Sequence, residues 1–212
     1  LILFDHNFEN DILAAARNMA KKYKCHASHN QVLEQYAMNI FDSTRRFHGL
    51  GDRERLLLQI AVTLHACGKF ISVRNSNECA YNIIMSTEII GISHLEREII
   101  ANVVRYNIRD FDYNMVRMET ELDEVTDSFS GQNEVMLLIA KLTAMLRLAN
   151  SMDRGHSAKL ADCRMTVKDQ NLIITTDYHG DITLEAVSFE QKAAFFEEIF
   201  GIRPVLRHKK YV

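Results

Sequence analysis

Residues 56–70 read LLLQIAVTLHACGKF, a nearly unbroken apolar run that ends in a histidine, a glycine and a lysine. Gly51 and Asp52 precede this run, and Asp52 is a good N-cap for a helix. A helix that is apolar on almost every side belongs at the centre of a bundle. The sequence therefore predicts a buried central helix that begins at Asp52 and ends close to His65.

The composition is that of an ordinary globular protein rich in helices. Of the 212 residues, 47% are hydrophobic and 25% are charged, and the chain has one proline and eight glycines. Its apolar runs are shorter than the roughly 18 residues of a membrane span, and no signal peptide is visible. The four cysteines form no C-x-x-C pair. We therefore expect a cytoplasmic protein with no membrane partner, and the initial Leu1 suggests a fragment.

Helical periodicity covers the first two-thirds of the chain. Gly91 is placed to end the fourth helix, and Ser93 and Glu96 form a capping box that opens the fifth. The acidic residues 110–130 are expected to form a loop or a short exposed helix. Helices are predicted at about 8–23, 32–41, 52–64, 79–90, 93–106 and 132–152.

The pattern changes after Arg154 and Gly155 to short β-branched runs. A capping box at Ser188 and a glycine at 201 then bound a last helix. We expect a mainly α protein with a helical domain at 1–155 and a small α+β subdomain at 156–212. The subdomain would hold a three- to four-stranded antiparallel sheet and one helix, with strands at 164–167, 172–176, 182–187 and 203–207.

Charge is unevenly distributed along the chain, although the net charge is only −3. Residues 45–74 and residues 141–168 each carry six basic and two acidic side chains, whereas residues 110–127 carry seven acids and only Arg117 as a base. The basic stretches are either an anion-binding site or solvated helix faces. Aromatic residues fit helix-core positions, so the sequence does not favour nucleic acid as a partner.

Several sequence motifs of this chain resemble those of known families. Residues 64–71 resemble the His-Asp-x-Gly-Lys centre of the HD phosphohydrolase superfamily, with Ala66 in place of the aspartate. The whole pattern is similar to the C-terminal HD-like region of the exopolyphosphatase / guanosine pentaphosphate phosphohydrolase (Ppx/GppA) family. The matching phrases are FHGLGDRER at 47–55, SHLEREIIA at 93–101, VRY at 104–106 and LRLANSMDR at 146–154.

The resemblance implies an HD-like helical bundle that serves as an accessory half of a larger hydrolase. In this family an N-terminal actin-like half, whose motifs this sequence lacks, hydrolyses terminal phosphoanhydrides of polyphosphate or of pppGpp, the stringent-response nucleotide. That half is expected to use Mg, whereas this chain is expected to need no cofactor. We therefore expect the chain alone not to be catalytic, but to bind a polyanion, to contact the actin-like domain and to form a homodimer.

The resemblance also assigns a degenerate metal site. His29 and His65 match the two main imidazole ligands, Ala66 replaces the central aspartate, and Asn150 replaces a late aspartate. Because carboxylates offset the charge of a bound cation, two histidines and an amide make a weak divalent site. We therefore expect no bound metal and no catalytic residue, with both histidines buried and hydrogen-bonded.

Basic residues adjoin this degenerate pocket, and they are candidates for binding phosphate because Arg and Lys match its oxygens and charge. The alternative is that they form ion pairs between helices, with Glu96, Glu98 and Asp153 as partners. Two other functions also stay open: an autonomous HD-type metal-dependent phosphohydrolase, and a regulatory module that binds a signalling nucleotide. The candidate phosphate-binding residues are Lys69, Arg74, Arg105, Arg147 and Arg154.

Overall fold

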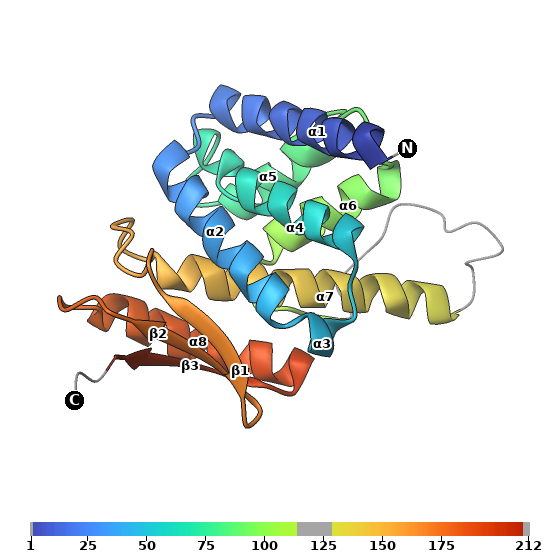
Figure 1. The fold of residues 1–212 in the computed structure, drawn as a ribbon. Helices are drawn as coiled ribbons and strands as arrows, with labels where there is room; N and C mark the ends of the chain where they lie inside the picture. Colours follow the sequence, from blue (N-terminus) through green and yellow to red (C-terminus); the bar gives the residue numbers. More distant parts are fainter. Residues whose placement is uncertain (1, 114–128, 210–212) are drawn as a thin grey trace. The chain divides into compact units, whose positions relative to one another are not determined.

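The computed structural model describes residues 2–113 and 129–209, and it confirms a mainly helical chain with a small α+β part (Figure 1). The acidic segment expected to be a loop or short helix lies largely outside the described residues, as does Arg117. The elements are α1 Ile2–Lys22, α2 Ala27–Ser43, α3 Arg45–His48, α4 Asp52–Leu64, the 3-10 helix η1 Cys67–Phe70, α5 Ser76–Met85, α6 His94–Arg105, α7 Phe129–Met152, β1 Arg164–Lys168, β2 Asn171–Thr176, α8 Thr183–Phe200 and β3 Arg203–His208.

The chain divides into two compact units, which are described separately below. Unit 1 comprises Leu1–His26 and Leu56–Thr143, and unit 2 comprises Ala27–Arg55 and Ala144–Val212. One division between them therefore falls where α2 begins, and the other two fall inside α4 and α7. The domain boundary expected near residue 155 marks a change in sequence pattern, and it stays a prediction.

In unit 1 the apolar run quoted above forms most of α4, as predicted. Every residue from Leu56 to Leu64 is buried except the half-buried Gln59, and Leu58, Ile60 and Leu64 are fully buried. Burying one such side chain stabilises the fold by about 1.5–3 kcal/mol. This helix is therefore a core element of unit 1.

The chain leaves α4 through η1, which packs tightly on α5. A Cβ added at Gly68 would lie 1.8 Å from the carbonyl oxygen of Ser76 and 2.5 Å from the amide nitrogen of Ala80. Backbone atoms cannot move aside as a flexible side chain can. Close packing of η1 against the backbone of α5 therefore requires glycine at position 68.

The capping box of α6 is confirmed, but the predicted end of the helix before it is wrong. Glu96 N donates to Ser93 Oγ at 3.2 Å, and Ser93 N donates to the Glu96 carboxylate at 2.9 Å. Helix α5 already stops at Met85, where the Thr87 hydroxyl donates back to the Ile83 carbonyl at 2.7 Å. Gly91 lies in the connection that follows, at φ 91°.

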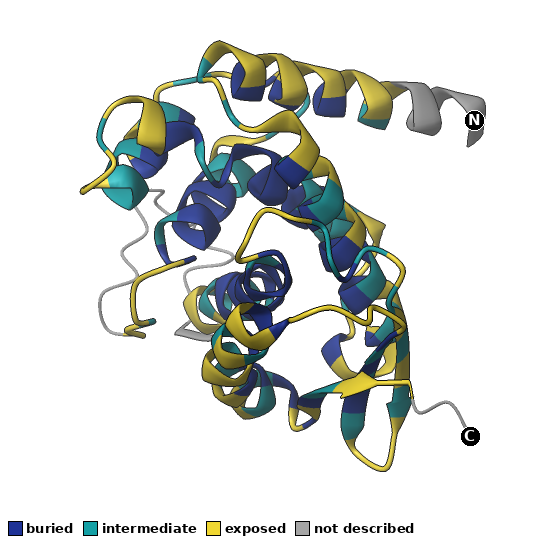
Figure 2. Ribbon diagram, turned by 90° about the vertical axis from the view of Figure 1, so that its left-hand side faces the viewer, coloured by how far each residue is buried: buried dark blue, intermediate teal, exposed yellow. Residues whose placement is uncertain are grey.

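Unit 2 contains a three-stranded mixed sheet in the order β1-β2-β3. Strand β1 pairs antiparallel with β2, with Met165 opposite Ile174. Strand β3 pairs parallel with β2, with Leu206 opposite Ile174. Alternate residues of β2 are buried and the others are half-buried; Figure 2 colours the whole ribbon by burial in this way. The sheet thus buries one side of its central strand.

The predicted strand at 182–187 and the fully antiparallel sheet are wrong. Thr183 donates from both its backbone N (2.8 Å) and its hydroxyl (2.6 Å) to Asp181 Oδ1, where α8 begins. An apolar run of this length fits either a strand or a buried helix. Because α8 carries the chain from β2 to β3, the two strands run parallel. The αL conformation of Gly201 at the end of α8 is as predicted.

Helix α7 is long and apolar enough to pass a composition test for a membrane span over Gly131–Met152. In an apolar 18-residue window of this segment, 67% is buried inside the protein. Apolar residues that pack in this way are those of a core helix.

Replacing Gly68 tests the close approach of η1 and α5. We expect Gly68→Ala to lower the free energy of unfolding by about 3 kcal/mol, because its methyl group would overlap backbone atoms. Urea unfolding followed by circular dichroism measures the loss. Gly51→Ala is the matched control, since the nearest atom to its Cβ is a flexible Glu54 oxygen at 3.2 Å. Equal stability of the two variants would contradict this packing.

Candidate functional site

His65, the histidine of the motif at 64–71, is hydrogen-bonded to the last turn of the helix before it. His65 is 9% exposed, and its Nδ1 donates to the Val62 carbonyl oxygen at 2.7 Å. This bond fixes the tautomer and the orientation of the ring. The next residue, Ala66, is half-buried and supplies no side-chain ligand.

In unit 2, His29 is held by a buried carboxylate. Its Nδ1 lies 2.7 Å from Asp153 Oδ2, and the side chains of both residues are almost fully buried. The ring also stacks on His156, with 3.8 Å between centroids and 4° between planes. His29 is therefore buried and hydrogen-bonded within this unit.

Asp153 also organises the loop that follows α7. Its Oδ1 accepts from the backbone N–H of Ser157 at 3.0 Å and of Ala158 at 2.8 Å. His156 and Ala158 both adopt φ 51°, a conformation that is uncommon for residues other than glycine. One carboxylate thus orients a histidine of α2 and stabilises a strained loop.

A divalent metal of the HD type does not fit the residues of this chain. Asp153 uses both oxygens for hydrogen bonds inside unit 2, and Asn150, one turn before it, offers only a neutral amide. Ala66 has no donor atom. Among residues 2–113 and 129–209, no group of three or more His, Cys, Asp or Glu side chains is arranged around one point.

The cysteines are also poor ligands and nucleophiles as they stand. All four are unpaired thiols in the described part of the chain. Burial raises the pKa of Cys67 to about 12 and the pKa of Cys163 to about 11. Because the thiolate is the reactive form, these two side chains are inert at neutral pH.

The candidate phosphate-binding residues fall into different environments. Lys69 and Arg74 of unit 1 and Arg154 of unit 2 are exposed. Arg147 is only 6% exposed, and its guanidinium carbon lies 4.7 Å from the centroid of the Phe195 ring. Arg147 therefore packs inside the protein, whereas Lys69, Arg74 and Arg154 are accessible to a ligand. Arg105 is half-buried and belongs to the ion cluster described below.

Two lysines that sequence reasoning missed lie beside Lys69. Tyr23, just after α1, packs edge-on against Phe70 of η1 with 5.9 Å between ring centroids. The Lys24 ammonium lies 5.7 Å from the Phe70 centroid, and the Lys22 ammonium lies 5.6 Å from the Tyr23 centroid. We call the exposed side chains of Lys22, Lys24 and Lys69 the basic surface.

The basic surface has no carboxylate in the segments that form it. Residues 12–26 and 56–77 contain no Asp or Glu. Burial raises the pKa of the Cys25 thiol, while its backbone hydrogen bond and the positive charge of Lys69 lower it. The influence of Lys69 on Cys25 agrees with its place beside the end of α1. The basic run KKYK at 21–24 is visible in the sequence, but its grouping with Lys69 depends on a contact through space.

A second cluster in unit 1 joins α5 to the end of α6. The Arg105 Nε donates to Glu78 Oε1 at 2.8 Å, and its Nη2 lies 2.8 Å from Oε2. Arg109 Nη1 contacts the same carboxylate. The Arg105 guanidinium carbon also lies 4.7 Å from the centroid of the Tyr81 ring. We call Glu78, Arg105 and Arg109 the arginine–glutamate cluster.

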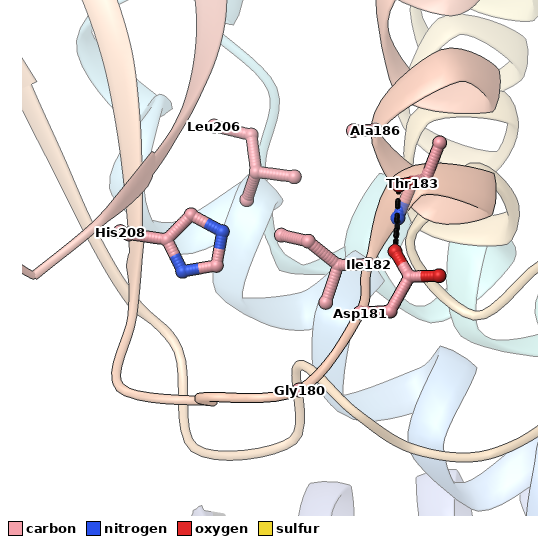
Figure 3. Close-up of a pocket in the computed structure, with 7 residues that line it drawn as sticks. All are labelled: Gly180, Asp181, Ile182, Thr183, Ala186, Leu206 and His208. Carbon is pink, nitrogen blue, oxygen red and sulfur yellow. Dashed lines mark hydrogen bonds between the residues drawn. The ribbon is translucent and has the colours of Figure 1, made fainter.

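A shallow cavity in unit 2 lies where α8 begins (Figure 3). Asp181 Oδ1 already accepts from Thr183 N at 2.8 Å, which occupies the helix end with negative charge. The hydrogen bonds from the Thr183 hydroxyl and from its backbone N–H lower the pKa of Asp181. The cavity therefore does not favour an anion. It is lined by Gly180, Asp181, Ile182, Thr183, Ala186, Leu206 and His208.

Comparison with known proteins identifies one family. The family model described as Ppx/GppA phosphatase, domain III, matches residues 13–193. No curated protein matches the chain. The matched region contains both histidines, the basic surface and the arginine–glutamate cluster.

Replacing Asp153 tests whether its carboxylate anchors His29 and the loop. We expect Asp153→Asn to lower the free energy of unfolding by roughly 2–4 kcal/mol, because an amide group would face the His29 nitrogen inside the protein. Urea denaturation measures the change. Asp162→Asn removes the same charge at an exposed position of unit 2 and should cost less than about 0.5 kcal/mol. If both variants behave alike, Asp153 does not anchor this region.

Proposed function

Because the chain belongs to the Ppx/GppA phosphatase family, with domain III spanning residues 13–193, we propose that it is an accessory domain which holds a phosphate chain. The parent protein would be an exopolyphosphatase or a pppGpp phosphohydrolase. Hydrolysis of the terminal phosphoanhydride would take place on an N-terminal actin-like half with bound Mg. This chain would keep the substrate close to that half.

The basic surface is the observation that carries this proposal. Polyphosphate is a flexible chain with negative charge along its whole length, so it needs several cations and little shape complementarity. Lys22, Lys24 and Lys69 provide such cations without a competing carboxylate nearby in sequence. Release of counterions from the polyanion would make such binding strong at low salt and weak at high salt.

The hydrogen bonding of two carboxylates, one in each unit, supports a binding role for this chain. Asp153 in unit 2 and Glu78 in unit 1 are both hydrogen-bonded to groups of the protein itself. A site that activates water with a divalent cation needs open carboxylate or imidazole ligands. Holding a phosphate chain needs only positive charge. The proposal also includes a contact with the actin-like domain and a homodimer, as in the family resemblance.

Reversing the basic surface tests the proposed function. We expect the triple variant Lys22→Glu, Lys24→Glu, Lys69→Glu to bind long-chain polyphosphate about tenfold more weakly or worse at low salt, because attraction becomes repulsion. Fluorescence anisotropy of end-labelled polyphosphate measures the affinity. All three positions are exposed, so the fold should be retained.

The single variant Lys168→Glu controls for charge reversal outside the basic surface, because Lys168 is an exposed lysine of β1 in the other unit. Its affinity should stay within about twofold of the unmodified chain. The single variant Lys69→Glu carries the same change in charge on the basic surface and should bind more weakly than Lys168→Glu. The proposal fails if the triple variant binds as tightly as the Lys168→Glu control, or if the unmodified chain does not bind polyphosphate at low salt.

A further inference from the structure

The arginine–glutamate cluster has the composition of an anion site whose occupant comes from the chain itself. Arg105 contacts both oxygens of Glu78 in a two-point fork, each at 2.8 Å. Arg109 contacts one of the same oxygens from the turn after α6. Two guanidinium groups therefore converge on one carboxylate. The net charge of the three side chains is positive.

We infer that Arg105 and Arg109 form a binding site for one phosphate group, and that Glu78 occupies this site until a ligand displaces it. The inference rests on the proposed function, because it takes phosphate as the ligand class. It adds a defined phosphate site, Arg105 and Arg109, whose residues are not those of the basic surface. It also adds a competitor for that site within the chain, the Glu78 carboxylate.

The chemistry of the fork favours phosphate over a carboxylate. A guanidinium group matches either anion with two parallel hydrogen bonds. Glu78 brings one negative charge, so it neutralises only one of the two arginines. A phosphate group with a charge near −2 neutralises both, and its third oxygen can accept a further hydrogen bond from Arg109.

Arg105 is oriented before any ligand arrives. Its guanidinium carbon lies 4.7 Å from the centroid of the Tyr81 ring, and burial raises the pKa of the neighbouring Tyr106. Asp112 also acts on Tyr106 electrostatically, so one further carboxylate belongs to these surroundings. An arginine held in place by packing loses less entropy when it binds an anion.

The cluster is also open enough to exchange its occupant. The side chains of Arg105 and Glu78 are 26% and 25% exposed, and that of Arg109 is 56% exposed. One ion pair, Arg105–Glu78, is enough to link α5 to α6. A second pair with the mostly exposed Arg109 contributes little to stability. Arg109 beside the same carboxylate is explained if the site binds a ligand with more negative charge than Glu78.

Removal of the Glu78 charge tests the inference directly. We expect Glu78→Gln to bind inorganic pyrophosphate about tenfold more tightly than the unmodified chain, because the amide no longer competes for the guanidinium groups. Isothermal titration calorimetry measures the affinity. The double variant Glu78→Gln, Arg105→Lys keeps the positive charge but lacks the fork, and it should lose this gain.

Glu88→Gln removes the same charge at an exposed position of unit 1 and controls for nonspecific electrostatics. The inference is overturned if Glu78→Gln binds pyrophosphate no better than Glu88→Gln, or if the gain survives Arg105→Lys. A melting temperature for each variant separates lost binding from lost folding. The two proposals can fail separately. If the triple lysine variant binds polyphosphate as tightly as the unmodified chain, the proposed function is rejected. If Glu78→Gln still binds pyrophosphate more tightly, the phosphate site at Arg105 and Arg109 is kept.

Discussion

The placement of two carboxylates governs the chemistry of both compact units. In unit 2, Asp153 accepts hydrogen bonds from His29 and from two backbone amides. In unit 1, Glu78 lies between Arg105 and Arg109. Buried or half-buried carboxylates are stable only when such donors surround them. Their negative charge is therefore directed inward, toward the protein's own donors.

Part of the positive charge of unit 1 faces outward. Lys22, Lys24 and Lys69 are exposed and lie on segments without acidic residues. The Ppx/GppA phosphatase family acts on phosphate-containing substrates, and domain III of this family spans residues 13–193 here. We propose that these exposed cations hold such a ligand.

Much of the fold could be predicted from the sequence, because local signals decided it. The apolar run of α4 and the capping box at Ser93 gave the correct helices. The strand expected at 182–187 is wrong, because a short apolar run fits a strand as well as a buried helix, and the hydrogen bonds of Thr183 to Asp181 favour the helix. Site residues depended on contacts through space. The stacking of Arg147 on Phe195 leaves no pattern in the sequence. The basic run at 21–24 is visible there, but the contact of Lys24 with Phe70 is not.

We propose that this chain retains phosphate chains and leaves them intact. The most direct measurement is to incubate the purified chain with labelled polyphosphate and divalent cations, and to determine both the bound fraction and the chain length recovered. We predict salt-sensitive retention of polyphosphate at its original length. Release of inorganic phosphate by this chain alone, or a bound fraction that does not respond to salt, would contradict it.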